Sequence, residues 1–192
     1  MSGSHNNILI TLYRSGKTTF RLNEIALLTG LVEFNSLNQK IHYLVKKGEL
    51  LNLRKGIYAL FDYSKQELAS KIYTPSYISL DYVLQKEGAI FQYDSSFTSV
   101  SYLSRAIEID GTVFRFRKIK NEILVNNSGI ILQNDGVCIA TKERAFLDYI
   151  YLNGESYIDN PSILDKNSVN QLLPIFNSQS LTKRVAKILK DV

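Results

Sequence analysis

Apolar residues recur at helical spacing in two short segments near the amino end of the chain, residues 23–29 and residues 35–47. Gly30 and Gly48 follow these segments. Glycine often ends a helix because it adopts a left-handed backbone conformation without a Cβ clash. Ala26 is a small residue that lets a second helix cross closely. The pattern therefore predicts two helices joined by a tight turn, as in a helix-turn-helix.

The second predicted helix separates an apolar stripe from a polar face. The stripe consists of Leu37, Ile41, Leu44 and Val45. At 100° per residue, the polar face and its flanks contain Asn35, Ser36, Gln39, Lys40, His42, Tyr43, Lys46 and Lys47. Amides of this kind can read base edges, and lysines and hydroxyls can contact phosphates. His42 is either a contact or a packed flanking residue.

We expect different contacts from different members of this face. Asn35 and Gln39 can pair bidentately with adenine, whereas Ser36 and Tyr43 are expected to meet phosphate. The three lysines are expected to bind phosphates as point charges. They are Lys40, Lys46 and Lys47.

Two runs with strand character, residues 49–53 and 57–60, follow the helix pair. The basic link Arg54-Lys55-Gly56 between them is typical of a hairpin turn. Two helices followed by a hairpin with a basic tip resemble bacterial winged-helix DNA-binding domains over about the first 60 residues. In such a fold, Arg54 and Lys55 at the wing tip are expected to reach a minor groove.

The net charge is concentrated in this part of the chain. Residues 1–60 contain eight Lys and Arg and three acidic residues, whereas residues 61–192 contain fifteen of each sign. The whole formal charge of +5 therefore lies on the segment that resembles a DNA reader. A solvated basic surface is the alternative interpretation.

The segment before the helix pair contains an incomplete phosphate-binding motif. Residues 6–15 have helical apolar spacing, although a strand is also compatible with them. Gly16-Lys17-Thr18 ends like a P-loop, but Thr11 occupies the position where that motif needs a glycine. A strand-like run at residues 19–22 follows instead of a helix. We therefore predict a turn and no nucleotide site here.

The second half predicts a mixed helix and strand domain. A connector at residues 63–75 contains a short helix stopped by Pro75, and we expect the winged helix to occupy residues 1–62 and the second domain 76–192. Ser79 is a candidate N-cap for a helix ending at Gly88. Period-two alternation predicts antiparallel strands at 97–102, 106–109, 112–119 and 129–133, with a turn at Asp110-Gly111. Helices are expected at 142–152, capped by Thr141, and at 167–176 and 180–190. The fold class is α+β: a winged helix-turn-helix followed by a mixed domain with a small antiparallel sheet and several helices.

Two motifs in the second half resemble the abortive-infection AbiEi antitoxin family. The first is Pro75-Ser76-Tyr77-Ile78-Ser79-Leu80, leading to Gly88-Ala89-Ile90 and Thr98-Ser99-Val100. The second runs from Ala140 to Tyr151, with Arg144 where the family is expected to have lysine. The resemblance covers nearly the whole chain. It implies an antitoxin of a type IV toxin–antitoxin system that represses its own operon by binding inverted repeats. It also implies a nucleotidyltransferase-like toxin as functional partner, counteracted without a stable complex.

Composition excludes several other classes of protein. No apolar run approaches the ~18 residues of a membrane span, and the stretch Met1–His5 lacks a secretory signal. The single cysteine, Cys138, excludes an internal disulfide framework. One cysteine and two histidines are also too few to form a histidine/cysteine zinc site. We expect a cytoplasmic protein without cofactor, metal or catalytic residues.

Three alternatives remain open from the sequence. Glu108 and Asp110, near a possible second basic patch of Arg115, Arg117 and Lys118, have the residue types of a nuclease site. The same residues are also typical of an exposed charged hairpin. The basic patch can equally serve as a second nucleic-acid contact. The chain can finally be a scaffold that binds a protein through its second half. Inverted repeats would favour two copies on DNA.

Overall fold

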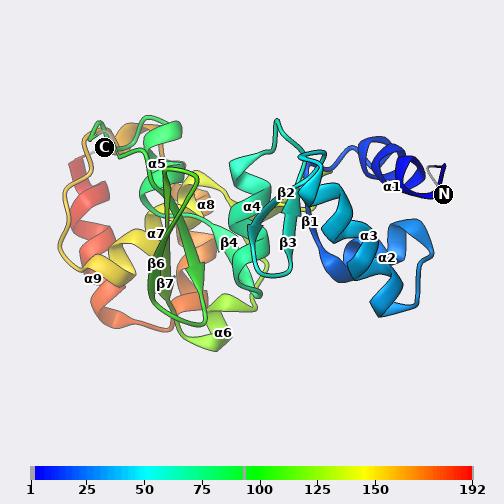
Figure 1. Cartoon of the computed structure of the whole chain (residues 1–192). Helices are drawn as coiled ribbons and strands as arrows, with labels where there is room; N and C mark the ends of the chain where they lie inside the picture. The colour runs from blue at the N-terminus through cyan, green and yellow to red at the C-terminus, as the bar shows by residue number, and fades with distance from the viewer. Residues whose placement is uncertain (1–2, 93, 192) are drawn as a thin grey trace. The chain divides into compact units, whose positions relative to one another are not determined.

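The computed structural model describes residues 3–92 and 94–191, and its elements are labelled in Figure 1. Met1 and Ser2, which belong to the stretch without a secretory signal, lie outside the described residues. The chain divides into two compact units. The first ends at Ile72 and the second begins at Tyr73. Each unit has its own sheet and its own buried core.

The first unit is a winged helix. Its elements are α1 (Gly3–Arg14), β1 (Thr19–Arg21), α2 (Leu22–Thr29), α3 (Phe34–Lys46), β2 (Leu51–Arg54), β3 (Ile57–Ala59) and α4 (Lys65–Ile72). The strands pair in the order β1-β3-β2, and both pairings are antiparallel. The predicted helix pair, the hairpin and the strand-like run at residues 19–22 are therefore confirmed. The segment Gly16–Thr18 forms the turn between α1 and β1, as predicted.

An apolar core holds α1, α2 and α3 of this unit together. It is built from residues that are between 0 and 5% exposed: Ile8, Leu12, Phe20, Ile25, Leu37, Ile41, Leu44, Leu50 and Leu60. Burying each such side chain stabilises the fold by about 1.5–3 kcal/mol. Because α3 contributes three of these residues, its rotation about its own axis is fixed by packing.

The expected connector at residues 63–75 is instead largely part of the first unit. Its helix α4 buries Leu68 and Ala69 at 0 and 1% exposure. The carboxylate of Glu67, 3% exposed, accepts hydrogen bonds from the Thr18 and Thr19 amides at 2.8 and 2.9 Å. It also accepts one from the Thr18 hydroxyl at 3.0 Å. The sequence alone could not predict this packing, because the partners are almost 50 residues apart.

A second set of polar contacts links α4 to the start of α2. The Arg21 guanidinium donates to the Lys71 carbonyl from Nε at 3.0 Å and from Nη2 at 2.6 Å. Lys71 pairs through its ammonium with Glu24, whose other oxygen accepts from the Arg21 amide at 2.7 Å. Burial opposes ionisation of Glu24, but these two partners outweigh it and lower the pKa of its carboxyl.

The second unit combines a six-stranded sheet with helices. Its strands are β4 (Ser76–Ile78), β5 (Phe97–Ser101), β6 (Arg105–Ile109), β7 (Thr112–Lys118), β8 (Ile130–Leu132) and β9 (Cys138–Ala140). Its α-helices are α5 (Asp81–Lys86), α6 (Asn121–Leu124), α7 (Lys142–Asn153), α8 (Lys166–Leu172) and α9 (Gln179–Ile188). Short 3₁₀ segments occupy Pro161–Ile163, Leu173–Phe176 and Leu189–Asp191.

The sheet of this unit confirms the α+β class but is larger than expected, and it is mixed. The strand order is β6-β7-β5-β4-β9-β8. The pairs β4–β5, β6–β7 and β8–β9 are antiparallel, whereas β5–β7 and β4–β9 are parallel. The turn between β6 and β7 has positive φ at Asp110 (49°) and Gly111 (67°), as the predicted hairpin requires. Strand β4 was not predicted, because three residues show no measurable alternation.

Helix α7 is the centre of the helical layer and contacts α5, α8, α9 and β9. As predicted, Thr141 caps it, accepting from the Arg144 amide at 3.2 Å. The expected cap at Ser79 is wrong: Leu80 precedes α5 with φ 60°. The Ser79 hydroxyl instead donates to Asp148 of α7 at 2.8 Å.

Arg144 and Asp148 form an ion pair on α7 that is 0% exposed. Arg144 Nε donates to Asp148 Oδ1 at 3.2 Å. Asp148 Oδ1 also accepts from the Tyr77 hydroxyl at 3.2 Å. The i,i+4 spacing thus marks an internal pair that joins α7 to β4. Burial raises the pKa of Asp148 to about 6, against the opposing effect of the nearby guanidinium.

The other donors of Arg144 bind backbone carbonyls of the segment that precedes β8. Nη1 donates to the carbonyls of Asn126 and Ser128 at 3.2 and 2.8 Å, and Nη2 donates to that of Ile123 at 2.8 Å. A Cβ at Gly129 would lie 2.8 Å from the Arg144 Cβ, so a glycine is required beside this side chain. A lysine at this position would supply one donor atom where Arg144 uses three.

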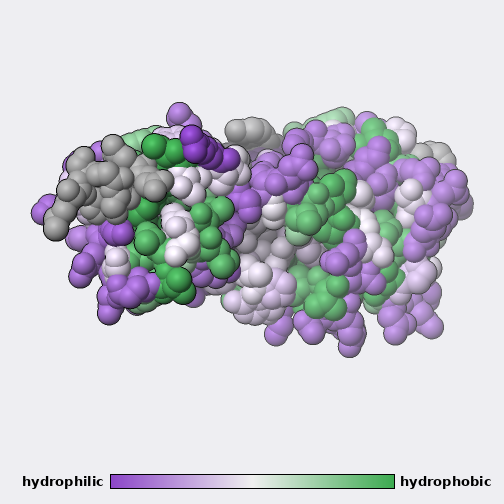
Figure 2. Space-filling view, turned by 90° about the vertical axis from the view of Figure 1, so that its right-hand side faces the viewer, coloured by the Kyte–Doolittle hydropathy of each residue, from purple (hydrophilic) through white to green (hydrophobic). Residues whose placement is uncertain are grey.

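The visible surface is a mosaic of apolar patches set among hydrophilic residues (Figure 2). Large apolar side chains that are more than half exposed include Leu27, Val32, Phe34, Phe91, Leu132 and Tyr157. Within the described residues, no helix combines the length and the apolar character needed to cross a bilayer.

We predict that Glu67→Ala destabilises the first unit by about 3 kcal/mol, because the buried Thr19 amide and the half-buried amide and hydroxyl of Thr18 lose a charged acceptor. Urea unfolding followed by circular dichroism measures the change. Asp62→Ala, at an exposed acid near the same helix, is the matched control and should change stability by less than about 0.5 kcal/mol. Equal effects of the two substitutions would show that Glu67 does not anchor α4.

We predict that Arg144→Met lowers the unfolding free energy of the second unit by about 3–5 kcal/mol at pH 8 and by less at pH 5. The substitution leaves a buried carboxylate without its cation. The folded pKa of Asp148, about 6, already lies above the unfolded value of about 3.9. The stabilisation that comes from the raised pKa of Asp148 is therefore fully present below about pH 4, and it is lost as the pH rises through the folded pKa.

Removing Arg144 raises the pKa of Asp148 further, so protonation of Asp148 at pH 5 relieves part of the loss of unfolding free energy. Chemical unfolding at pH 5 and at pH 8 measures this loss. Lys120→Met, at an exposed cation, serves as the control and should show no such pH dependence. A loss that is as large at pH 5 as at pH 8 would contradict the role assigned to Asp148.

Candidate nucleic-acid interface

Helix α3 presents the polar face that the sequence predicts. Glu33 caps the helix by accepting from the Ser36 amide at 3.1 Å. Leu37, Ile41 and Leu44 are at most 1% exposed and point into the core. The opposite side is open to solvent because none of its residues contributes to that core. Its exposed residues are Asn35, Gln39, His42, Tyr43, Lys46 and Lys47.

The flanking residues of the helix are less open than its centre. Ser36 and Lys40 are half-buried, as is Arg54 on the hairpin, whereas Lys55 is exposed. His42, for which two interpretations were left open, is exposed on α3. The structure thus brings the predicted residues of α3 onto one side of the helix.

Lys47 is engaged within the protein. Its Nζ lies 3.6 Å from Glu49 Oε1 and 5.0 Å from the centroid of the Tyr43 ring. The Tyr43 hydroxyl and the Glu49 carboxylate raise the pKa of Lys47, so it stays charged. Glu49 is its competitor for any phosphate. Lys46 has no such acidic partner among the described residues, which makes it the better phosphate contact.

The wing is a short hairpin with a tight tip. The turn contains Lys55 and Gly56, and the φ of Gly56 is 77°, a value that favours glycine. A register irregularity between Asn52 and Arg54 twists β2 just before this turn. Arg54 therefore lies against the unit, and only Lys55 projects freely at the tip. This geometry fits a contact with the DNA backbone better than deep insertion of two basic residues.

A basic hollow of about 270 Å³ lies beside the wing tip. Its charged lining residues are Arg21, Arg54, Lys55 and Lys71. Two of these cations already have partners within the protein: Arg21 donates to the Lys71 carbonyl, and Lys71 pairs with Glu24. The hollow extends the positive surface of the wing toward α4.

A second hollow, of about 380 Å³, separates α3 from the hairpin. It is lined by Asn38, Gln39, His42, Val45, Asn52 and Tyr58. Sequence reasoning missed Asn38, Asn52 and Tyr58. Asn52 and Tyr58 stand opposite each other in the hairpin register, so a correct register would have pointed to them. The hollow places amide, imidazole and phenol groups beside Gln39, where they can hydrogen-bond polar edges.

The possible second basic patch is partly neutralised within the second unit. Arg115 pairs with Asp94 and donates to the Ser96 hydroxyl at 2.6 Å, and Arg117 donates to the Asn153 side chain at 3.1 Å. Lys118 lies on the other face of β7, because side chains alternate along a strand.

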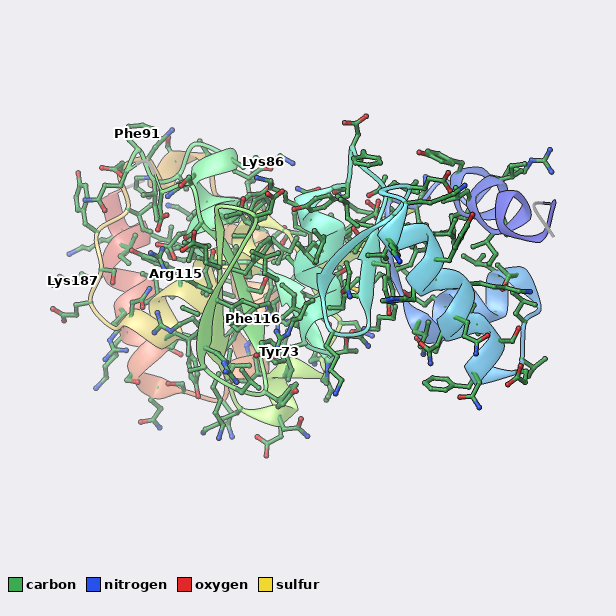
Figure 3. The ribbon with its side chains drawn as sticks, in the orientation of Figure 1. Tyr73, Lys86, Phe91, Arg115, Phe116 and Lys187 are labelled. Atoms are coloured by element: carbon green, nitrogen blue, oxygen red, sulfur yellow. The ribbon has the colours of Figure 1, made fainter. Side chains whose placement is uncertain are left out.

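On that other face, Phe116 is 1% exposed and packs edge-on against Tyr73, with ring centroids 4.8 Å apart. Figure 3 labels both rings and Arg115, which precedes Phe116 on β7. The structure therefore brings two of the three predicted cations together, each with a protein partner.

Glu108 and Asp110 lie on the β6–β7 hairpin, and Asp110 is at its turn. Both side chains are exposed. In the part of the chain that the structure describes, no group of three or more His, Cys, Asp or Glu is placed to hold a metal ion. Glu108 and Asp110 thus lie on an exposed hairpin.

The chain is thus an α+β protein of two units, the first a winged helix with an open polar face. No protein-family model and no curated protein matches it. Among solved structures it is similar to the crystal structure of the RV2827C protein from Mycobacterium tuberculosis, with a TM-score of 0.59 and 12% sequence identity. The alignment covers 97% of this chain and 76% of that chain. At this identity, the similarity establishes the fold.

Proposed function

We propose that the chain binds double-stranded DNA in a sequence-specific manner, with α3 in the major groove and the β2–β3 hairpin against the backbone. The observation that carries the proposal is the exposed amide and lysine face of α3, whose opposite face is fixed in the core. At 13 residues, α3 is about 20 Å long. Such a helix fits a major groove that is about 12 Å wide.

The roles follow from placement and chemistry. Asn35 and Gln39 are exposed on α3 and would read base edges, because their amides offer a donor and an acceptor together. Lys40 and Lys46 of α3 and Lys55 at the wing tip would bind phosphates, since their side chains carry the positive charge that phosphates attract. The net charge of the first 60 residues supports this orientation, since a basic surface attracts the phosphate backbone.

We further propose the biological role that the AbiEi resemblance implies: a cytoplasmic autorepressor and antitoxin of a type IV toxin–antitoxin system. Two copies would occupy inverted repeats upstream of the operon. The functional partner would be a nucleotidyltransferase-like toxin, counteracted without a stable complex, and the chain itself would have no catalytic activity. The two motifs that carry the resemblance meet in the fold, where Ser79 and Tyr77 donate to Asp148. This contact joins the two motifs within the second unit, and the antitoxin role rests on the resemblance alone.

We predict different effects on DNA binding from two exposed residues of α3. Gln39→Ala should relax base preference at one position and cost about 1–3 kcal/mol on the preferred site. Lys46→Ala should weaken binding to all sequences alike and reduce the slope of log K against log salt concentration by about 1. Gel-shift titrations of the full chain against upstream and scrambled duplexes, at several salt concentrations, measure both effects.

Lys86→Ala, at an exposed lysine of α5 in the second unit, is the matched control for loss of one positive charge. It should leave affinity and salt slope unchanged. Lys47→Ala should have a smaller effect than Lys46→Ala, because Lys47 is already paired with Glu49. Binding that survives both Gln39→Ala and Lys46→Ala without change would show that α3 is not the reading element.

A further inference from the structure

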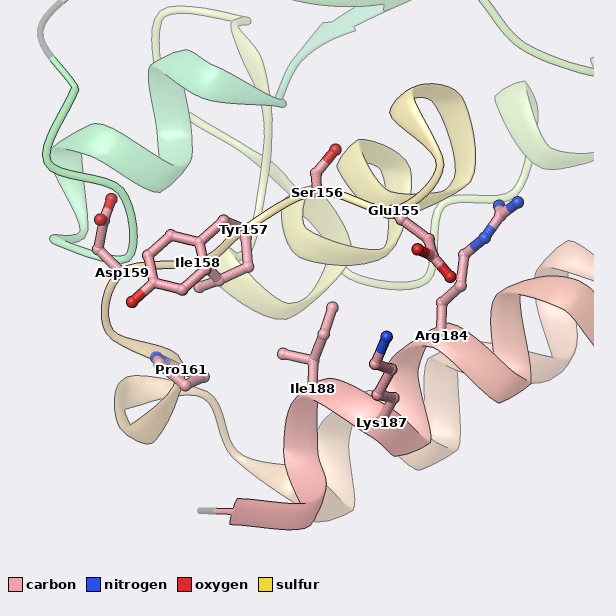
Figure 4. Close-up of a pocket in the computed structure, with 9 residues that line it drawn as sticks. All are labelled: Glu155, Ser156, Tyr157, Ile158, Asp159, Pro161, Arg184, Lys187 and Ile188. Carbon is pink, nitrogen blue, oxygen red and sulfur yellow. The ribbon is translucent and has the colours of Figure 1, made fainter.

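The second unit contains a hollow of about 490 Å³ between the segment 155–161 and helix α9. Figure 4 shows Arg184, Lys187 and Ile188 projecting from α9 toward that segment. The volume lies within the range of about 300–1,000 Å³ that is usual for small-molecule sites. The hollow lies in a different unit from the incomplete Gly16-Lys17-Thr18 motif.

One wall of the hollow is apolar and carries an aromatic ring. Ile158 is 4% exposed, and Pro161 and Ile188 are half-buried. The Tyr157 ring stands at the mouth and is 79% exposed. A flat apolar ligand can pack on this wall and stack on Tyr157, which would bury a large aromatic surface that is otherwise in water.

Two cations stand on the α9 side of the hollow. Arg184 and Lys187 are three residues apart and therefore lie on the same side of the helix. Within the described residues, neither side chain makes a hydrogen bond or a salt bridge. The guanidinium can hold a phosphate with two parallel hydrogen bonds, and the ammonium adds a point charge.

The polar groups of the opposite segment complement this arrangement. Asp159 is already used, since its Oδ2 accepts from the Phe91 amide at 2.8 Å and ties the segment to its neighbour. Ser156 is also used, in a side-chain hydrogen bond with Tyr149. Glu155 remains at the rim beside Arg184. A carboxylate at this place can accept hydrogen bonds from the hydroxyl groups of a ligand.

We propose that this hollow binds a nucleoside 5′-monophosphate. The base stacks on Tyr157 against Ile188 and Pro161. The phosphate lies between Arg184 and Lys187, and the ribose spans the distance between them and Tyr157. The combination of an aromatic wall with two adjacent unpaired cations distinguishes this ligand from a purely apolar one, which would leave both cations without a partner.

Isothermal titration calorimetry of the full chain tests the proposal, with AMP, GMP, CMP and UMP as probes. At least one nucleotide should bind, and its nucleoside and inorganic phosphate should each bind at least about tenfold more weakly. Lys187→Ala and Arg184→Ala should each weaken binding by roughly tenfold or more, since each removes a charged hydrogen-bond donor. Lys183→Ala, at an exposed residue of α9 outside the hollow, should change it by less than about twofold.

Tyr157→Ala should also weaken binding by about tenfold, whereas Tyr157→Phe, which keeps the ring, should not. Tyr157 and Lys187 are exposed, so these variants are expected to fold even if Arg184→Ala does not. Absence of binding by all four nucleotides at 1 mM would overturn the proposal. Inorganic phosphate or a polyglutamate peptide binding as tightly as the nucleotide would also overturn it, because charge alone would then explain the interaction.

Discussion

The burial of one face of α3 is the constraint on which the proposed DNA-binding surface depends. Leu37, Ile41 and Leu44 enter a core that α1, α2 and the hairpin also line, so the helix cannot rotate without exposing apolar surface. The amide and lysine face is consequently held toward solvent. A flexible or partly buried helix of the same sequence would offer no defined pattern of hydrogen-bonding groups. The packing of the first unit thus fixes the orientation of α3 that the proposed base reading requires.

Each unit also uses one buried charged side chain to gather polar groups from distant segments. In the first unit, Glu67 collects two amides and a hydroxyl and fixes α4 to the turn before β1. In the second, Arg144 collects three backbone carbonyls and Asp148. Burying a charge is costly unless its partners satisfy it, and both groups are surrounded by such partners. These interactions specify how segments meet, and the apolar cores supply most of the stabilisation.

Local signals in the sequence predicted the local structure well. Gly30, Gly48 and the Asp110-Gly111 turn marked element ends correctly, because these positions need positive φ. Such local signals could not predict which distant segments pair or pack with one another. The parallel pairing of β4 with β9 joins segments about 60 residues apart, and the packing of α4 depends on Thr18. The Arg144–Asp148 spacing is the same for an exposed pair as for the fully buried pair observed.

The same difference between local and long-range structure applies to the candidate DNA-binding residues. The helical wheel placed Gln39 and Tyr43 on the exposed side of α3, since one turn of a helix needs only local geometry. It could not reveal that Glu49 pairs with Lys47, or that Asn52 and Tyr58 line a hollow beside Gln39. Those contacts depend on where the hairpin packs, which the hydrophobic pattern leaves open.

The most direct test is an NMR titration of the full chain with a duplex from the region upstream of its gene. The account predicts that amide signals of residues 35–47 and of the β2–β3 hairpin shift most, while signals from the buried residues Leu12 and Ile25 stay nearly unchanged. Shifts confined to the second unit, or no shifts at DNA concentrations that saturate a gel-shift assay, would contradict it.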